Sequence, residues 1–495
     1  MASSFGYSSL EANTPPGSDE SVEMTSVSAK SLPELSSTTN PILYQADSAY
    51  VPVDASEHGE QNGWVREIVD YSLPEYHAVI DVPRGQNQSW WAKMRTYLGP
   101  GALVAVGYMD PGNWSTAIAG GSAYGYTLLF VVLLSSLMAM FLQVLALKVG
   151  LATNRDLAQA CRDAYPKEVV AILWIVMEVA ICATDIAEVI GSAVALKLLF
   201  GLPLVIGVCI TAADVLLLLF MNGRSFRFLE ILVALLILVI TVSFITQLFL
   251  SQPDAGPLFL GFLPSTELIT NKQMLFIGVG IIGATVMPHN LFLHSSIVLT
   301  RNVAREEPSI KEAIHFGTID STVSLTLALF VNASILMVSA ATFHKHGYDE
   351  VTTLENAYQL LDPILKSGVA SAFFAIALLA SGQNSTLTGT LTGQIVMEGF
   401  MTWKMPPTLR RVVTRLLAIV PSVVCVAIGG DHSANYLLLL SQVILSFALP
   451  FAMIPLVHIS SSSKYMGAFV NSTTTCVLAV MVSSIILILN FVLLV

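Results

Sequence analysis

The sequence predicts an all-α membrane protein that crosses the bilayer many times, and three observations lead to this prediction. First, 54% of the 495 residues are hydrophobic and only 12% are charged, with a mean hydropathy of +0.71. So few charges cannot build the surface of a water-soluble globule. Second, apolar stretches of about 20 residues, long enough to span a bilayer, recur along the chain. Third, prolines break two of these stretches.

The apolar stretches begin after residue 90 and predict eleven transmembrane helices. We expect these helices to begin near residues 97, 124, 169, 203, 226, 273, 314, 368, 411, 435 and 472. The third carries the acidic residues Glu178, Asp185 and Glu188, and the eighth is rich in Ser, Thr, Gln and Gly. Both compositions are typical of helices that face a cavity or pack closely on a neighbour.

The two breaks lie in the first and sixth predicted helices. Pro111 and Gly112 interrupt the first helix, and Pro288 interrupts the sixth. This spacing is the pattern of a five-plus-five inverted repeat whose first helices are both discontinuous. Lipid tolerates unwound backbone only where it lines a cavity enclosed by protein, so the breaks predict a binding site in the middle of the membrane.

Residues 1–90 form a separate region ahead of the first helix. They hold 13 Asp and Glu against three Lys and Arg, so this region carries most of the formal charge of −11. Its composition, rich in Ser, Glu and Pro, predicts a disordered acidic tail. Residues 91–495 are predicted to form the transmembrane transport domain.

The positions of Lys and Arg predict the orientation, because cytoplasmic loops carry the excess of positive charge. With the N-terminus in the cytosol, only Lys197, Lys272, Lys345 and Lys366 lie on the outer side. We therefore expect a cytosolic N-terminus. A basic start with a short apolar core is missing, so no cleavable signal peptide is expected. The sequence fits a plasma membrane and an endomembrane, such as that of a vacuole or endosome, equally well.

The residues beside the first break are suited to bind a metal ion. Asp110 is a carboxylate inside a membrane helix, which is costly unless a counter-ion such as a divalent cation is present. Asn113 lies three residues later, on the same side of the helix, and offers a neutral oxygen. The alternative is that Asp110 only caps the resumed helix and that Asn113 only packs against its neighbours.

Met287, beside the second break, narrows the choice of metal. A thioether binds Mn²⁺, Fe²⁺, Co²⁺ or Cd²⁺ acceptably but offers little to Ca²⁺ or Mg²⁺. Pro288 lacks an N–H group, so the carbonyl of Ala284, four residues earlier, is left without its helical donor and is a further candidate ligand. The alternative for Met287 is that its side chain only packs.

His289 and His294 follow the second break and are candidates for carrying or sensing protons, because imidazole titrates near physiological pH. The alternative for each is a histidine hydrogen-bonded inside the helix bundle. Together the residues at the two breaks predict a transporter of divalent metal ions. The chain has no Gly-x-x-x-x-Gly-Lys-Ser/Thr nucleotide-binding loop, so ion gradients are expected to supply the energy.

Four stretches of the sequence resemble the Nramp family of proton-coupled divalent metal transporters. They are residues 107–114 (GYMDPGNW), 183–191 (ATDIAEVIG), 283–294 (GATVMPHNLFLH) and 380–394 (ASGQNSTLTGTLTGQ). The resemblance extends over roughly residues 95–490 and implies a LeuT-like fold of eleven helices. It also implies that the metal is held by Asp110, Asn113, Met287, the carbonyl of Ala284 and, as the outer gate closes, Gln442.

The resemblance further implies a path for protons. Protons are expected to enter through Asp110 and His289 and to leave along the third helix. Asp185 and Glu188 lie on one face of that helix, and Glu178 lies seven residues before Asp185 on nearly the same stripe. Buried carboxylates in series have raised pKa values and can relay protons.

The alternative for these carboxylates is an internal salt bridge to Arg410, Arg411 or Arg415 on the ninth helix, and in this family both roles can hold. Asp320, in the seventh helix, is expected to be a gate or helix-packing residue and not a metal ligand.

We therefore expect a secondary active transporter that imports Mn²⁺ or Fe²⁺ with protons by alternating access, with Cd²⁺, Co²⁺ and Zn²⁺ as further candidate cargo. The alternatives are a Mg²⁺ transporter of the related branch, which would be expected to lack the Met287 sulfur, an amino-acid carrier, and a non-transporting receptor with the same fold. We expect no enzymatic activity or catalytic residues, no permanently bound cofactor and no nucleic-acid partner. The expected partners are the metal ion, the proton and the lipid bilayer, with the chain acting as a monomer.

Overall fold

The computed structural model of the chain describes residues 71–82, 88–211, 226–351, 353–401 and 407–494. Between residues 407 and 433 it describes the side chains of only some residues. All described residues belong to one compact unit, Ser56–Val495. Residues 1–70 of the predicted disordered tail lie outside the described residues.

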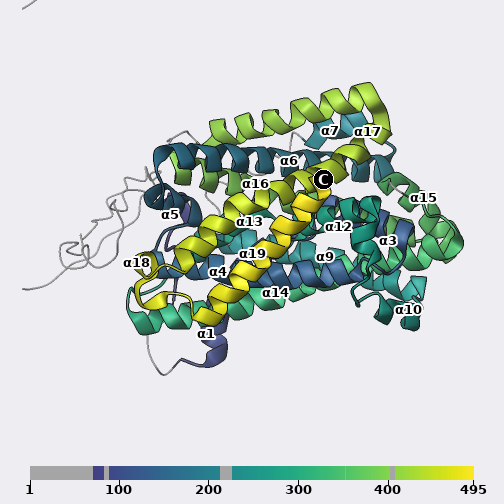
Figure 1. The fold of residues 1–495 in the computed structure, drawn as a ribbon. Helices are drawn as coiled ribbons and strands as arrows, with labels where there is room; N and C mark the ends of the chain where they lie inside the picture. Colours follow the sequence, from purple (N-terminus) through teal and green to yellow (C-terminus); the bar gives the residue numbers. More distant parts are fainter. Residues whose placement is uncertain (1–70, 83–87, 212–225, 352, 402–406, 495) are drawn as a thin grey trace, which may run out of the picture. The chain divides into compact units, whose positions relative to one another are not determined.

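The described residues are mostly helical, as the sequence predicts (Figure 1). In chain order the helices are α1 Trp90–Tyr97, α2 Pro100–Gly107, α3 Pro111–Tyr124, α4 Leu129–Thr153, α5 Leu157–Ala164, α6 Lys167–Phe200, α7 Leu204–Thr211, α9 Phe226–Ser251, α10 Ala255–Leu260, α11 Glu267–Thr270, α12 Lys272–Thr285, α13 Pro288–Ile297, α14 Glu307–Thr342, α15 Leu354–Leu365, α16 Ala370–Met401, α17 Pro407–Ser460, α18 Ser463–Met466 and α19 Thr473–Leu494. Short 3-10 helices lie at Pro74–Tyr76, Val298–Thr300, His344–His346 and Gly467–Phe469. Strands β1 Ile80–Asp81 and β2 Arg301–Asn302 pair in parallel.

Seven helical segments within the described ranges are long and apolar enough to cross a membrane. They are Leu129–Thr153, Lys167–Phe200, Phe226–Ser251, Lys272–Thr300, Glu307–His346, Ala434–Ser460 and Thr473–Leu493. The other four predicted spans correspond to α2 with α3, to α7, to α16 and to the first half of α17. Residues 212–225, where the fourth predicted span continues, lie outside the described residues.

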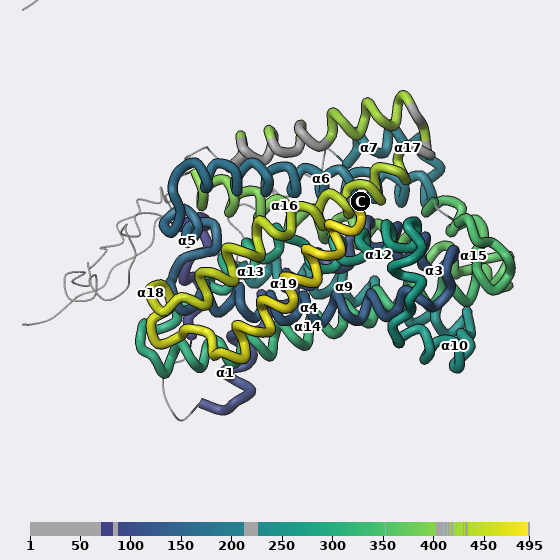
Figure 2. The backbone as a smooth tube through the Cα atoms, in the orientation of Figure 1, coloured from purple at the N-terminus to yellow at the C-terminus, as the bar shows by residue number. Residues whose placement is uncertain are grey.

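Helix α17 contains the ninth and tenth predicted spans. The chain departs from helical geometry at Gly430, where φ is +59° and ψ is −150°. The two halves of α17 run in opposite directions (Figure 2). A positive φ strains residues that carry a side chain, which explains a glycine at the turn.

Both helix breaks are present where the prolines predict them. The first predicted span leaves its helix after Gly107 and resumes at Pro111, and the sixth leaves its helix after Thr285 and resumes at Pro288. Each proline is the first residue of the resumed helix, where the missing N–H group leaves no hydrogen bond unmade.

The broken helices lie in the interior of the unit. Every residue of α13 is buried, and α13 packs against α4, α16 and α17. Helix α12 packs against α3, α4 and α17. The two breaks are therefore enclosed by protein, which is the condition under which unwound backbone is stable at membrane depth.

Residues 71–82 fall inside the region predicted as a disordered tail, and here the structure differs from the predicted boundary at residue 90. The hydroxyl of Ser72 donates to the Asp156 carboxylate at 2.6 Å, and Leu73 is buried in the main hydrophobic core. Strand β1 pairs with β2 in the register Ile80 to Arg301. Composition averaged over 90 residues hides the apolar side chains of this short segment.

Candidate metal-binding site

The two helix breaks meet in the folded chain. A Cβ atom added to Gly107, at the first break, would lie 2.1 Å from Nδ2 of Asn290, which follows the second break. A Cβ atom at Gly112 would lie 1.7 Å from Nε2 of Gln442 on α17. The glycines therefore let side chains of distant helices rest directly on the unwound backbone of the first span.

Asp110 caps the resumed helix and keeps one carboxylate oxygen without a hydrogen bond in the described part of the chain. It is fully buried and is the N-cap residue of α3, because its Oδ1 accepts a hydrogen bond from the Asn113 N–H group at 2.8 Å. Its Oδ2 is buried and finds no hydrogen-bond donor among the described residues. Capping thus uses one carboxylate oxygen and leaves the other available to a cation.

Two further side-chain oxygens near this break are also buried without a hydrogen-bond donor among the described residues. Asn113 donates from its Nδ2 to the Tyr108 carbonyl, and Gln442 donates from its Nε2 to the Ser441 hydroxyl at 3.1 Å. The Oδ1 atom of Asn113 and the Oε1 atom of Gln442 are both buried and unpaired within the described part of the chain. A buried acceptor without a donor is costly, and a metal ion satisfies several at once.

The second break supplies a sulfur atom and a carbonyl. Met287 is completely buried and stands directly ahead of α13, with φ −19° and ψ 117°. Nδ2 of Asn290 lies 3.6 Å from the Met287 sulfur. Ala284, also buried, lies in the last turn of α12, and Pro288 offers no N–H group to its carbonyl.

No three His, Cys, Asp or Glu side chains gather to hold a metal ion in the described ranges. The predicted ligands contain a single carboxylate, with amide and carbonyl oxygens and one thioether. Such a mixed set suits a borderline transition metal better than the several carboxylates that Ca²⁺ requires.

Sequence reasoning missed the side chains that support this unwound backbone. Asn332 on α14 donates to the Tyr108 carbonyl at 2.7 Å, and Ser381 on α16 donates to the Met109 carbonyl. These two carbonyls belong to the break itself, so α14 and α16 fix its course. The only signal in the sequence is that both residues are polar within membrane helices.

The two histidines of α13 have different surroundings. His289 is buried, with Nδ1 3.5 Å from the Thr184 hydroxyl on α6. His294 has Nδ1 3.0 Å from Oε1 of Gln143, whose Nε2 donates to the Tyr108 hydroxyl at 3.0 Å. His294 is therefore hydrogen-bonded inside the bundle through Nδ1, while its Nε2 is buried without a partner among the described residues.

Helix α6 lies beside the first break, and two of its acidic residues lie beside α16. A Cβ atom at Gly191 of α6 would lie 2.1 Å from the Pro111 ring. A Cβ atom at Gly389 of α16 would lie 3.0 Å from Glu188 Oε1 and 3.3 Å from Asp185 Oδ1, so both carboxylates face α16.

Glu178 occupies a less buried position and accepts a hydrogen bond from the Trp174 indole at 2.9 Å. The side chains of Arg410 and Arg411, the predicted salt-bridge partners, lie outside the described residues.

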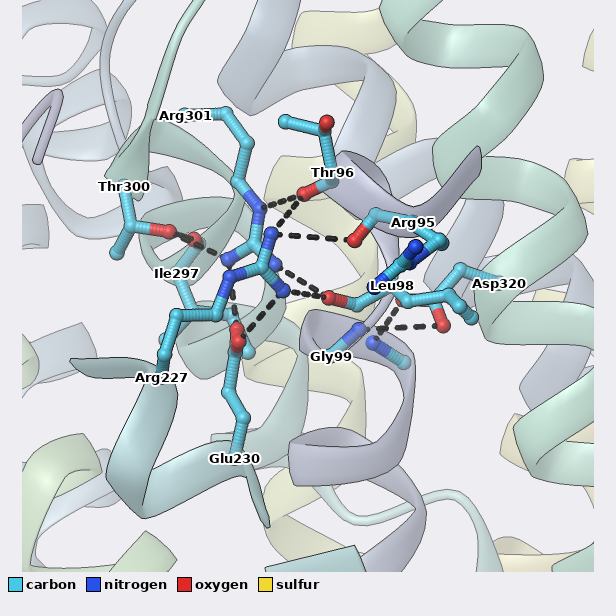
Figure 3. Close-up of polar contacts among 11 residues, drawn as sticks. Arg95, Thr96, Leu98, Gly99, Arg227, Glu230, Ile297, Thr300, Arg301 and Asp320 are labelled. Atoms are coloured by element: carbon cyan, nitrogen blue, oxygen red, sulfur yellow. Dashed lines mark hydrogen bonds and ion pairs between the residues drawn. The ribbon is translucent and has the colours of Figure 1, made fainter. Parts of the chain in front are cut away.

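Asp320 contributes to a different part of the molecule. Its carboxylate accepts from the backbone N–H groups of Gly101 at 2.7 Å and Gly99 at 3.4 Å (Figure 3). These residues begin α2, one helix ahead of the break. Asp320 therefore packs α14 against the start of α2, in keeping with the gate or packing role expected for it.

Comparisons with known proteins also indicate a transporter of divalent metal ions. A family model described as natural resistance-associated macrophage protein-like, or Nramp, matches residues 101–495. A divalent metal cation transporter of Nostoc is 55% identical over 85% of this chain and 94% of its own length. One of Listeria monocytogenes is 52% identical over 89% of this chain and 98% of its own.

Solved structures show the same similarity. A crystal structure of the Eremococcus coleocola manganese transporter matches with a TM-score of 0.78 and 44% identity, over 85% of this chain and 90% of that one. The transporter Mhp1, of the nucleobase-cation-symport-1 family, matches with a TM-score of 0.54 and 15% identity, over 80% of this chain and 89% of that one. The second match concerns the fold alone and confirms the LeuT-like architecture.

Proposed function

We infer that this chain, which belongs to the Nramp family, is an integral membrane transporter that carries divalent metal ions, with Mn²⁺ among its cargo. This inference rests on one structural observation. Three buried side-chain oxygens without donors in the described residues lie where two helix breaks meet, and a buried thioether stands at one of those breaks. A dehydrated borderline cation is the ligand that uses all of these groups.

The proposed ligands each supply a distinct contribution. The Asp110 carboxylate provides the single negative charge, and Asn113, Gln442 and the Ala284 carbonyl provide neutral oxygens that replace water. The Met287 sulfur favours Mn²⁺, Fe²⁺ or Cd²⁺ over Mg²⁺ and Ca²⁺, which bind oxygen almost exclusively. The metal is the cargo, and no resident cofactor is proposed.

Proton coupling is proposed to use groups that adjoin the metal site. His289 faces α6 through Thr184, and Asp185, Glu188 and Glu178 continue along that helix. A chain of ionisable residues inside a membrane protein is the usual form of a proton relay. Arg410 and Arg411 are proposed to balance the charge of these carboxylates.

The N-terminus is proposed to lie in the cytosol, and the metal to move toward it by alternating access.

Uptake by the purified protein in liposomes tests the function. We expect Mn²⁺, Fe²⁺ and Cd²⁺ to enter, and to enter faster at an external pH of about 5.5 than at about 7.5, on either side of the histidine range. An excess of Mg²⁺ or Ca²⁺ should leave Mn²⁺ uptake unchanged. Mg²⁺ uptake at the rate of Mn²⁺ uptake, or no metal uptake at either pH, would contradict the proposal.

Replacing Glu188 by Gln tests the proposed proton path. Because the amide keeps the shape of the side chain and cannot exchange a proton, we expect Mn²⁺ uptake to become slower and independent of external pH. The matched control is Glu168→Gln, which removes a carboxylate from the exposed first turn of the same helix. A pH dependence that persists in Glu188→Gln would remove this residue from the path.

A further inference from the structure

Residues 71–82, which we call the strap, precede α1 and join segments that lie far apart in the sequence. Ser72 donates to the carboxylate of Asp156, which is the N-cap residue of α5. Glu75 accepts a hydrogen bond at 3.1 Å from Nε2 of Gln394, a buried residue of α16. The first half of the strap is therefore attached to α5 and α16.

The second half of the strap is attached to the chain that follows α13. The Ala78 N–H group donates to the Leu299 carbonyl at 2.9 Å, and β1 pairs with β2. The Asp81 carboxylate also accepts a hydrogen bond from Nδ2 of Asn302 at 3.0 Å. Leu299 and β2 come directly after α13. These contacts therefore hold the second broken helix at the end that is far from Met287.

The strap also covers this end of α13. A small cavity is lined by residues of the strap together with Asp156, Ser296 and Thr300. Ser296 belongs to the last turn of α13 and is 5% exposed. A Cβ atom added to Gly399 of α16 would lie 3.2 Å from the Ser72 hydroxyl, so the strap also packs closely on α16. Detachment of the strap would therefore expose the end of α13 to water.

Two features indicate that the strap can detach while the helices stay folded. Ala78 has φ +52°, a left-handed conformation that is unfavourable for a residue with a Cβ atom. Release of the strap relieves this strain. Of the residues in the strap, only Ser72 and Leu73 are buried. Segments with few buried apolar contacts open locally at a lower free energy than the core helices.

The contacts of the strap connect parts of the molecule that move against each other during transport. Helix α13 begins at the second break, and α16 holds the first break through the hydrogen bond from Ser381 to the Met109 carbonyl. Alternating access requires the broken helices to shift relative to the helices around them. A segment bonded to α5 and α16 on one side, and to Leu299 and β2 on the other, opposes such a shift.

We propose that the strap is an autoinhibitory element, which holds the metal path closed at its own end of the molecule and whose release limits the rate of metal uptake. A looser strap raises the population of the open state, and a tighter strap lowers it. Ser72 and Ala78 are the positions at which this hold can be changed in opposite directions. The proposal rests on the proposed transport function, but the first measurement that tests it needs no metal.

The first measurement is the rate at which the strap exposes the end of α13. Ser296→Cys places a thiol there, in a side chain of nearly the same shape. The full chain carrying this substitution is placed in lipid nanodiscs, with both faces accessible, and treated with a charged maleimide. Mass spectrometry of the peptide around residue 296 gives the labelling rate at that site, separately from the native cysteines. The second measurement is Mn²⁺ uptake by the same variants in liposomes.

Adding Ser72→Ala is expected to raise the labelling rate about tenfold and to speed Mn²⁺ uptake, because the buried Asp156 carboxylate loses a hydrogen bond from the strap. Adding Ala78→Gly should lower the labelling rate about threefold and slow Mn²⁺ uptake, because glycine adopts the docked backbone conformation without strain. The matched control is Thr326→Ala, which removes an exposed hydroxyl that donates to the Thr322 carbonyl of its own helix. Both rates should keep their original values in this control.

A labelling rate that either substitution leaves unchanged, in monodisperse protein, would overturn the strap as a moving part. If labelling changes as expected while Mn²⁺ uptake keeps its original rate in both variants, the strap detaches but does not inhibit transport, and the proposal fails. Should Ser72→Ala not fold, Ala78→Gly decides alone, since it favours the docked conformation. Absence of Mn²⁺ uptake before either substitution is added would contradict the transport function, and the labelling rates would still show whether the strap detaches.

Discussion

Replacing Asp110 by Asn is expected to abolish Mn²⁺ uptake. The amide can still accept the hydrogen bond from the Asn113 N–H group, so the cap of α3 and the local fold should remain. The change removes the only negative charge among the proposed ligands. Loss of a buried charge partner costs about 3–5 kcal/mol, which corresponds to more than about 100-fold in binding.

Calorimetric titration with Mn²⁺ and uptake into liposomes measure this effect separately. The matched control is Asp254→Asn, which removes an exposed carboxylate that pairs with Lys345 and should leave both quantities unchanged. Thermal unfolding establishes that the Asp110→Asn protein is folded. Mn²⁺ uptake within a factor of about two of the original protein would remove Asp110 from the ligand set.

The helix breaks could be predicted from sequence because their cause is local. Pro111 and Pro288 lack the N–H group that would continue the preceding helix, and each is the first residue of the helix that resumes after a break. The meeting of the two breaks required a further step, from their spacing to an inverted repeat. The resemblance to a known family supplied Gln442, whose approach to Gly112 no local pattern could indicate.

Other features depend on contacts that no sequence pattern carries. Arg227 and Arg301 stand near the ends of predicted helices, where positive charge normally marks a cytoplasmic loop. Their pairing with Glu230 and with the carbonyls of α1 appears only once distant segments are brought together. His294 is similar, because its hydrogen bond to Gln143 joins α13 to α4, a contact that no local pattern could indicate.

Residues 71–82 illustrate the opposite error, in which an average hides a local signal. The acidic composition of residues 1–90 predicts disorder as a whole, yet Leu73 is buried and Ser72 is paired with Asp156. Strand β1 lies beside β2, which contains Arg301. This short segment therefore supports the backbone of Arg301, whose side chain pairs with Glu230.

Replacing Met287 by Ala is expected to change which ions the protein accepts. The sulfur is the only soft atom among the proposed ligands, so its loss should lower the affinity for Cd²⁺ by about tenfold or more. Water or a neighbouring oxygen would then take its place, and the site would become one of oxygen ligands alone. Mg²⁺ and Ca²⁺, which prefer such ligands, should begin to compete with Mn²⁺ for uptake.

The stability of the variant cannot by itself distinguish a ligand from a packing residue, because truncating any buried methionine leaves a cavity that costs about 2–5 kcal/mol. Met274→Ala is the matched control, since Met274 is also buried and belongs to α12, the helix just before the break. Both variants should lower the unfolding temperature, but only Met287→Ala should admit Mg²⁺ and Ca²⁺ in a competition assay. If the two variants keep the same order of ion preference as the original protein, Met287 packs like Met274 and selectivity must come from the oxygens.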